Sequence, residues 1–155
     1  MYLEEMFGLS KKTAVVTGAG RGIGQAIAIG LAKAGAEVAI ISRSGAEETV
    51  RMITENGGSA YDLRADVTKE DEVDRAVAEI LNRSGKIDIL FNNAGICIHK
   101  GTLEASIDEW KSVIDTNLTG EYIMARAVGR IMIEKGIRGS IVNMASMSGT
   151  IVNIP

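Results

Sequence analysis

The 155-residue sequence has one cysteine, one histidine and one proline. A single cysteine, Cys97, cannot form an internal disulfide, so the cysteine content gives no argument for secretion. A single histidine, His99, cannot by itself make a metal site, and we expect none. A free cysteine in an intracellular protein is usually a small buried apolar residue, which is what we expect of Cys97.

Long apolar runs and a strong excess of charge of one sign are also missing. No apolar stretch approaches the roughly 20 residues that a membrane span needs, and Glu4 and Glu5 interrupt the N-terminus where a signal peptide would be apolar. The net charge of −3 does not indicate binding to nucleic acid or anionic lipid, which favours an excess of positive charge. A chain of this length buries roughly 68–70% of its unfolded surface. We therefore expect a single soluble, cytoplasmic domain over residues 1–155.

What the chain does contain is a regular alternation of apolar runs and helical periodicities. The predicted strands are 13–17, 37–42, 59–66, 87–92 and 140–144. The predicted helices are 23–34, 46–56, 69–84 and 106–134, the last with an apolar stripe that includes Trp110 and Leu118. Continuous apolar strands separated by helices indicate a parallel sheet covered on both faces. The sequence predicts a doubly wound, three-layer α/β/α fold with strand order 3-2-1-4-5 and a ligand at the carboxyl ends of the strands.

A glycine-rich turn, TGAGRGIG at 17–24, joins the first predicted strand to the first helix. A turn without Cβ atoms lets backbone N–H groups approach a pyrophosphate, and the helix N-terminus behind it is partially positive. The dinucleotide pattern G-x-G-x-x-G does not fit, because positions 23 and 27 are isoleucine. The pattern T-G-x-x-x-G-x-G does fit. The turn predicts a nucleotide ligand, although an ordinary β–α turn remains an alternative at this point.

Four more motifs follow in order along the chain. Asp66-Val67 ends the third predicted strand, Asn92-Asn93-Ala94-Gly95 ends the fourth, Asn117 lies in the last helix, and Ser146 follows the fifth strand. Together with the glycine turn, this ordered set resembles the short-chain dehydrogenase/reductase family over about residues 9–148. The resemblance implies a Rossmann-type fold and an NAD(P)(H)-dependent oxidoreductase that interconverts a secondary alcohol and a ketone.

The resemblance also implies a cofactor site. The glycines shape the pyrophosphate turn, Asp66 accepts a hydrogen bond from the adenine amino group with Val67 behind the ring, and 93–95 steady the fourth strand beside the adenine ribose. Asp66 taken alone is more often a helix N-cap, a place that Thr68 could also take. We assign the cofactor site to Gly18, Arg21, Gly22, Ile23, Gly24, Arg43, Asp66, Val67, Asn93, Ala94 and Gly95.

The end of the second predicted strand bears on the choice of cofactor. It reads Ile41-Ser42-Arg43-Ser44, without the carboxylate that would favour a free 2′-hydroxyl. Arg43 is placed to pair with a 2′-phosphate through its planar fork, and Arg21 is placed to reach the same group. The sequence predicts NADP(H) as the preferred cofactor and NAD(H) as the alternative, in which both arginines are simply solvated.

For catalysis, the resemblance implies that Ser146 hydrogen-bonds the substrate oxygen and that the backbone of Asn117 holds a water in a proton relay. Ser148 competes with Ser146 for its role. The family also uses a tyrosine followed four residues later by a lysine, whose charge helps a phenol of pKa about 10 to exchange protons. Four residues after Tyr2, Tyr61 and Tyr122 stand Met6, Ala65 and Arg126.

The Tyr122–Arg126 pair precedes Ser146, whereas the family's tyrosine follows that serine, so we interpret it as core packing or an exposed helical pair. We expect the catalytic tyrosine and lysine beyond Pro155. The chain is then the N-terminal part of a longer enzyme, without its catalytic helix and last strands, and inactive alone.

Two other hypotheses compete with this one. The chain is alternatively a truncated nucleotide-binding module without redox turnover, or a methyltransferase, which Arg43 and the motif at 92–95 disfavour. The partner of the intact enzyme is a small alcohol or ketone. Because the family's long helix commonly packs against another subunit, we also expect a homo-oligomer, dimer or tetramer, and a core or subunit contact for Trp110.

Overall fold

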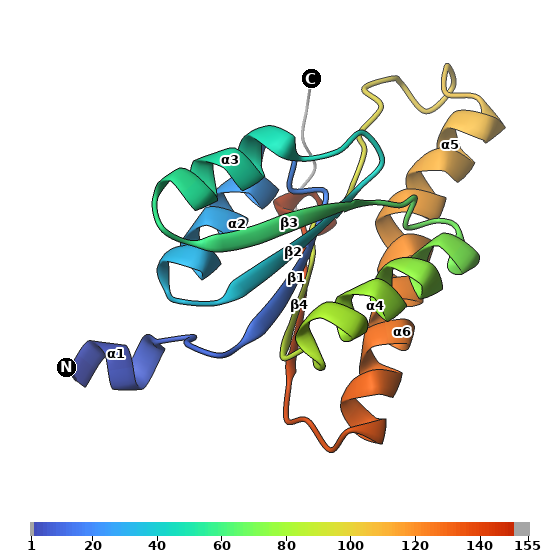
Figure 1. The fold of residues 1–155 in the computed structure, drawn as a ribbon. Helices are drawn as coiled ribbons and strands as arrows, with labels where there is room; N and C mark the ends of the chain where they lie inside the picture. Colours follow the sequence, from blue (N-terminus) through green and yellow to red (C-terminus); the bar gives the residue numbers. More distant parts are fainter. Residues whose placement is uncertain (1, 151–155) are drawn as a thin grey trace.

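Five parallel strands form one sheet at the centre of the protein (Figure 1). The computed structural model describes residues 2–150. The strands are β1 (Thr13–Thr17), β2 (Glu37–Ser42), β3 (Ser59–Arg64), β4 (Ile89–Asn92) and β5 (Ser140–Asn143). Their order is β3-β2-β1-β4-β5, and every neighbouring pair is parallel. The predicted sheet and strand order are confirmed.

Helices cover both faces of this sheet (Figure 1). The helices of residues 2–150 are α1 (Tyr2–Phe7), α2 (Gly22–Lys33), α3 (Glu47–Glu55), α4 (Glu70–Ser84), α5 (Ile107–Ile114) and α6 (Gly120–Glu134), with a π-helical turn η1 (Asp115–Thr119) and a 3-10 turn η2 (Met147–Gly149). The pair α2 and α3 lies on one face, and α4 and α6 lie on the other. The three-layer Rossmann-type architecture is therefore confirmed.

The core consists of one apolar cluster on each face. Alternate residues of β1 face opposite ways, so Val15 packs toward α4 and α6 whereas Val16 packs toward α2 and α3. The first cluster includes Val73, Ile80, Met124 and Val128, and the second includes Ala28, Ala32, Val38 and Ile53. Burial on both faces explains why the central strands are continuously apolar.

The predicted helix 106–134 is not one regular α-helix. Its backbone stays helical, but residues 115–119 form the π-turn η1, in which Gly120 N–H donates to the Asp115 carbonyl. A π-turn inserts one extra residue into an α-helix, and the apolar pattern of this segment did not indicate that insertion. Of the core or subunit contact expected for Trp110, the core contact is not formed: Trp110 on α5 is 63% exposed, and α5 extends past the ends of the strands (Figure 1). Leu118 on η1 is also 63% exposed.

Two smaller differences concern segment ends. The third strand ends at Arg64 rather than at residue 66, and helix α1 was not predicted. Helix α1 stands apart from the three layers, with Tyr2, Met6 and Phe7 exposed, so no core contact imposes a helical apolar pattern on it (Figure 1). No helix within residues 2–150 is long and apolar enough to cross a bilayer.

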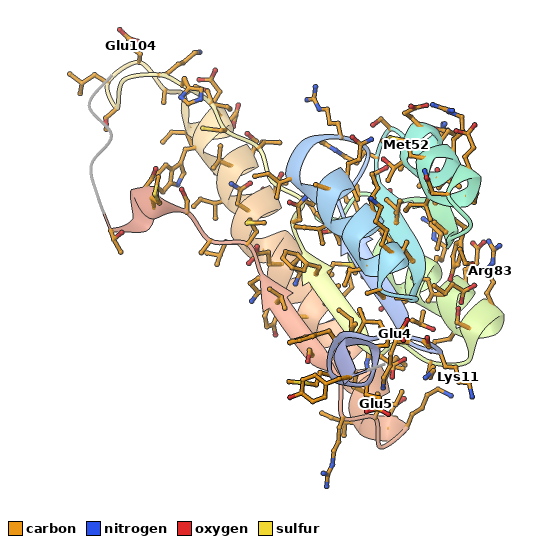
Figure 2. All side chains as sticks on the ribbon, turned by 90° about the vertical axis from the view of Figure 1, so that its left-hand side faces the viewer. Glu4, Glu5, Lys11, Met52, Arg83 and Glu104 are labelled. Carbon is orange, nitrogen blue, oxygen red and sulfur yellow. The ribbon has the colours of Figure 1, made fainter. Side chains whose placement is uncertain are left out.

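A buried carboxylate joins β1 and β4 at the amino edge of the sheet. This is the edge where Lys11 lies, and Glu104 marks the opposite end of the molecule (Figure 2). Asp88 accepts hydrogen bonds from Lys12 Nζ at 2.8 Å and from Thr13 N–H at 3.0 Å, and Lys86 Nζ lies 3.0 Å away. Burial alone would raise the pKa of Asp88, but these donors outweigh it and hold the pKa below its ordinary value.

The lowered pKa of Asp88 predicts a pH-dependent contribution to stability. A carboxyl group whose pKa is lower in the folded state stabilises the fold above its unfolded pKa of about 3.9 and loses that contribution as pH falls through the folded value. We expect Asp88→Asn to reduce the free energy of unfolding at pH 7 by about 1–3 kcal/mol, with a shrinking deficit below about pH 4. Urea unfolding at several pH values measures this.

Asp71→Asn is the matched control, because Asp71 forms an exposed ion pair with Arg75 at 3.3 Å. It should cost about 0–1 kcal/mol at pH 7. A deficit for Asp88→Asn that is equal to that of the control, or that does not change between pH 7 and pH 3, contradicts the assignment.

Candidate nucleotide-binding site

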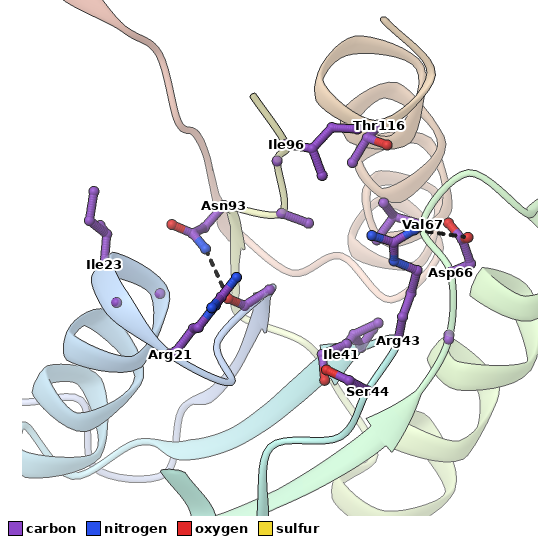
Figure 3. A pocket seen from close by; sticks show the side chains of 17 residues that line it. Arg21, Ile23, Ile41, Arg43, Ser44, Asp66, Val67, Asn93, Ile96 and Thr116 are labelled. Atoms are coloured by element: carbon purple, nitrogen blue, oxygen red, sulfur yellow. Dashed lines mark hydrogen bonds and ion pairs between the residues drawn. The ribbon is translucent and has the colours of Figure 1, made fainter. Parts of the chain in front are cut away.

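A cavity of about 500 Å³ opens at the carboxyl ends of the strands (Figure 3). It lies where β1 and β4 meet, at the point where the order of the strands reverses, which is where open α/β sheets bind ligands. Every residue that we assigned to the cofactor lines it: Gly18, Arg21, Gly22, Ile23, Gly24, Arg43, Asp66, Val67, Asn93, Ala94 and Gly95. Segments up to about 80 positions apart in the sequence thus meet in one place.

The glycine turn between β1 and α2 is closely packed against the end of β4. Gly18 has a φ of +68°, and a Cβ there would lie 2.8 Å from the Ala94 Cα. A Cβ on Gly24 would lie 2.4 Å from Asn93 Nδ2 and 2.8 Å from the Gly18 carbonyl oxygen. These contacts explain why both positions require glycine.

Side chains from β1 and β4 fix this end of the turn. Asn93 Nδ2 donates to the carbonyl of Thr17 at 3.0 Å and to that of Gly18 at 3.3 Å. In return, Thr17 Oγ1 accepts from the N–H groups of Asn93 and Ala94 at 3.0 and 2.9 Å. Reciprocal hydrogen bonds thus join the end of β1 to the segment that follows β4.

The first turn of α2 faces the cavity without a side-chain cap. In the described part of the chain, its N-cap residue Arg21 makes no side-chain capping hydrogen bond. Unpaired N–H groups at a helix N-terminus favour an anion. The turn therefore offers donors of the kind that a diphosphate accepts.

Asp66 and Arg43 face each other on the side of the cavity away from the glycine turn (Figure 3). Asp66 Oδ1 accepts from Thr68 N–H at 2.9 Å and from Thr68 Oγ1 at 2.8 Å, and Arg43 lies 4.0 Å from Asp66 Oδ2. Burial raises the pKa of Asp66, but the Thr68 donors and the Arg43 charge outweigh it and lower the pKa. The N-cap of α4 is Lys69, so Asp66 caps the preceding turn and stays ionised beside the cavity.

Asn117 contributes its side chain, which the sequence did not indicate. It lies in the π-turn η1, where its Nδ2 donates to the Ile96 carbonyl at 2.9 Å and its Oδ1 accepts from the Ile96 N–H at 2.8 Å. Asn117 does not line the cavity, but its hydrogen-bond partner Ile96 and the preceding residue, Thr116, do. The amide therefore fastens the cavity wall to η1. An asparagine on a long helix after an Asn-Ala-Gly segment is the only sequence signal of this contact.

Ser146, like Asn117, is a predicted site residue that does not line the cavity. It is the N-cap of η2, where its Oγ accepts from Ser148 N–H at 3.2 Å, and it is exposed. Cys97 is also exposed, contrary to prediction, because the loop after β4 runs over the surface rather than through the core. Among residues 2–150, no group of three or more His, Cys, Asp or Glu side chains is arranged to hold a metal ion.

The tyrosines of the described segment point elsewhere. The Tyr61 hydroxyl lies 3.4 Å from Ser84 Oγ, with Arg83 stacked 3.8 Å from its ring centre, and burial raises the pKa of its phenol. Tyr122 is 62% exposed, with the Arg126 guanidinium 6.0 Å from its ring centre, which fits the interpretation as an exposed helical pair. Neither side chain lines the cavity.

The fold and this cavity define a Rossmann-type nucleotide-binding domain. The sequence pattern of the family described as short chain dehydrogenase matches residues 12–154. The chain belongs to the short-chain dehydrogenase/reductase family, as the ordered motifs indicated.

Relatives with assigned activities lie within this family. The chain is 38% identical over 151 residues to a 3-oxoacyl-[acyl-carrier-protein] reductase of Synechocystis, covering 96% of this chain and 61% of that protein. It is 40% identical to the 2-dehydro-3-deoxy-D-gluconate 5-dehydrogenase of Escherichia coli and 36% identical to glucose 1-dehydrogenase 2 of Bacillus subtilis. Those matches cover 91% and 90% of this chain, and 56% and 55% of the two proteins. The chain thus spans little more than half the length of these relatives.

Solved structures agree with the fold. A short-chain type dehydrogenase/reductase from Mycobacterium marinum superposes with a TM-score of 0.96 at 39% identity, over 100% of this chain and 64% of that one. The protein gox2181 superposes with a TM-score of 0.94 at 37% identity, over 100% and 61%.

The contact between Asn117 and Ile96 predicts a local change in dynamics. Removing both hydrogen bonds with Asn117→Ala should raise the exchange rate of the Ile96 amide by about tenfold or more, because a hydrogen bond contributes about 1 kcal/mol. Hydrogen-exchange NMR measures this directly. Asn56→Ala is the matched control, because the Asn56 side chain is exposed and bonds only its own helix end at Met52. An Ile96 exchange rate that is equal in wild type and Asn117→Ala refutes the contact.

Proposed function

We propose that the chain forms the cofactor-binding part of an NAD(P)(H)-dependent oxidoreductase that interconverts a secondary alcohol and a ketone by hydride transfer. The observation that carries this proposal is the convergence of the glycine turn, Arg43, Asp66 and the Asn-Ala-Gly segment on one cavity. The activities named for the relatives, one reductase and two dehydrogenases, support redox chemistry.

In this proposal the cofactor lies across the ends of β1, β2 and β3. The N–H groups of the glycine turn hold the diphosphate, and Asp66 accepts a hydrogen bond from the adenine amino group with Val67 behind the ring. Gly95 and the preceding two residues flank the adenine ribose.

NADP(H) is the preferred cofactor in the proposal, with NAD(H) as the alternative. The cavity wall after β2 consists of Ser42, Arg43 and Ser44, without a carboxylate to repel a 2′-phosphate. Among residues 2–150, the Arg43 guanidinium has a long, partly exposed pairing with Asp66 Oδ2 at 4.0 Å. A phosphate offers the guanidinium fork a stronger partner than this, so Arg43 is available to it.

The catalytic step combines residues of this chain with residues outside it. When bound, NADP(H) supplies or accepts the hydride. We assign to Ser146 a hydrogen bond to the substrate oxygen and to the Asn117 backbone a place in the proton relay. Because Tyr61 and Tyr122 lie away from the cavity, we assign the proton-donating phenol and its lysine to the part of the protein outside residues 1–155. Residues 1–155 alone then bind the cofactor without turnover.

A homo-oligomer also belongs to the proposal. Ile107, Trp110, Leu118 and Tyr122 are exposed at helical spacing along α5, η1 and α6. Exposed apolar side chains in one stripe are typical of a surface that another chain covers.

The assignment of Arg43 predicts a coenzyme-specific loss of affinity. Charge-assisted hydrogen bonds contribute about 1.5–3 kcal/mol, so Arg43→Ala should raise the dissociation constant for NADPH about tenfold to a hundredfold. The dissociation constant for NADH should change less than about threefold, because NADH has no 2′-phosphate. Fluorescence titration with each coenzyme measures both values.

Arg75→Ala is the control, because Arg75 is an exposed arginine of α4 that does not line the cavity. It should leave both affinities unchanged. Equal weakening of both coenzymes by Arg43→Ala contradicts the NADP(H) preference, and a wild-type protein that binds neither coenzyme contradicts the proposed function.

A further inference from the structure

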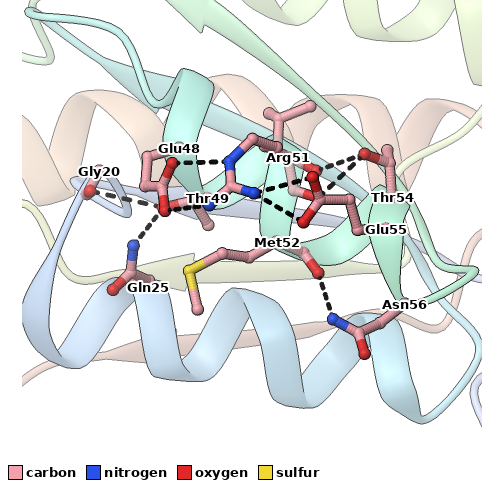
Figure 4. A network of polar contacts seen from close by, with 10 residues as sticks. Gly20, Gln25, Glu48, Thr49, Arg51, Met52, Thr54, Glu55 and Asn56 are labelled. Carbon is pink, nitrogen blue, oxygen red and sulfur yellow. Dashed lines mark hydrogen bonds and ion pairs between the residues drawn. The ribbon is translucent and has the colours of Figure 1, made fainter.

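A fully buried hydroxyl lies behind the glycine turn. Thr49, in the first turn of α3, is 0% exposed. Its Oγ1 donates to the Ala19 carbonyl at 2.8 Å. The Gly20 carbonyl lies 3.4 Å from the same oxygen, which also accepts from Gln25 Nε2 at 2.9 Å (Figure 4). A hydroxyl buried this deeply costs free energy unless it is hydrogen-bonded, and here both its donor and acceptor capacities are used.

These bonds fix which way the middle of the turn faces. In a planar trans peptide the carbonyl and the following N–H point in opposite directions. Holding the Ala19 carbonyl toward α3 therefore points the Gly20 N–H away from α3, and the weaker contact with the Gly20 carbonyl favours the same orientation for Arg21 N–H. If the hydroxyl were absent, the Ala19 carbonyl would lose this donor.

Gln25 determines which way the Thr49 hydroxyl hydrogen points. Because Gln25 Nε2 occupies an acceptor site of Thr49 Oγ1, the hydroxyl hydrogen is left to the Ala19 carbonyl. On the opposite side, Asn93 holds the carbonyls of Thr17 and Gly18. Three consecutive carbonyls of the turn are thus held by side chains from β4 and α3.

The helix that carries Thr49 is itself anchored independently of any ligand. Ala46 N–H donates to Asp62 Oδ2 at 3.2 Å, and Glu47 pairs with Arg64 at 2.8 Å, both on β3. The start of α3 is therefore fixed to the sheet, and Thr49 holds the turn from a rigid support.

We propose that Thr49, oriented by Gln25, is a positioning residue that sets the glycine turn in its diphosphate-binding conformation before the cofactor arrives. This inference rests on the proposed function. A preorganised turn avoids the cost of ordering on binding, so losing the hydroxyl should weaken binding of any ligand with that diphosphate. NADPH and NADH should lose affinity equally, in contrast to the expected effect of Arg43→Ala.

The experiment compares two substitutions of Thr49 by fluorescence titration with NADPH and with NADH. Thr49→Val has nearly the same shape without the hydroxyl, and we expect both dissociation constants to rise about tenfold. Thr49→Ser retains the hydroxyl, and we expect it to bind within about threefold of wild type. Thr54→Val is the matched control, because Thr54 lies on the same helix and its exposed hydroxyl bonds only to Val50 and Arg51 carbonyls. It should bind both coenzymes like wild type.

A second variant covers the case in which Thr49→Val does not fold. Gln25→Leu removes the donor that orients the hydroxyl from a half-buried position on α2. It should weaken both coenzymes about threefold or more.

The outcomes separate the two claims. The role of the hydroxyl is overturned if the wild-type protein binds the coenzymes and Thr49→Val binds them with the same affinity. It is also overturned if Thr49→Ser and Thr49→Val weaken binding equally. If Thr49→Val does not fold, unchanged binding in Gln25→Leu overturns it. A wild-type protein that binds neither coenzyme overturns the proposed function, and this inference with it.

Discussion

The structure depends on side chains from two other segments that hold the carbonyl groups of the glycine turn. A turn that offers N–H donors to an anion must place its carbonyls elsewhere, and buried carbonyls need partners. Asn93 and Thr49 supply those partners from two different layers of the fold. The glycines at 18 and 24 allow β4 and the turn to approach closely enough for Asn93 to reach. The turn is consequently a tertiary feature rather than a local one.

The amino and carboxyl ends of the parallel strands differ in how their charged groups are paired. At the amino edge, Asp88 is surrounded by cationic and N–H donors that join β1 to the start of β4. At the carboxyl edge, the segments after β1, β2, β3 and β4 separate and leave the cavity between them. Charge is satisfied internally at the first edge, whereas Arg21, Arg43 and the open start of α2 leave positive potential at the second. A polyanionic ligand fits that distribution.

The sequence predicted much of this arrangement, for physical reasons. Central strands buried on both faces must be apolar throughout, so their number and positions in the sequence followed from the apolar pattern. Their spatial order followed from right-handed crossovers with a switch between the first and fourth strands, and from the family resemblance. Residues after parallel strands meet at one edge, so the whole predicted cofactor set lines one cavity. Hydrogen bonds between distant segments have no such pattern, so the Asn117–Ile96 and Thr49–Ala19 contacts were not foreseen. Apolar character does not reveal where a helix or loop leaves the core, so the exposure of Cys97 was not predicted, and for Trp110 the sequence left a core contact and a subunit contact open.

The central claim is that backbone N–H groups of the glycine turn hold the diphosphate of NADP(H). Amide chemical shifts of isotope-labelled protein, followed by NMR during titration with NADPH, test it most directly. The account predicts the largest shift changes at the amides of residues 20–24, with smaller changes at Asp66 and Ala94. Amides of the turn that do not respond, while saturable changes occur in another part of the chain, would contradict it.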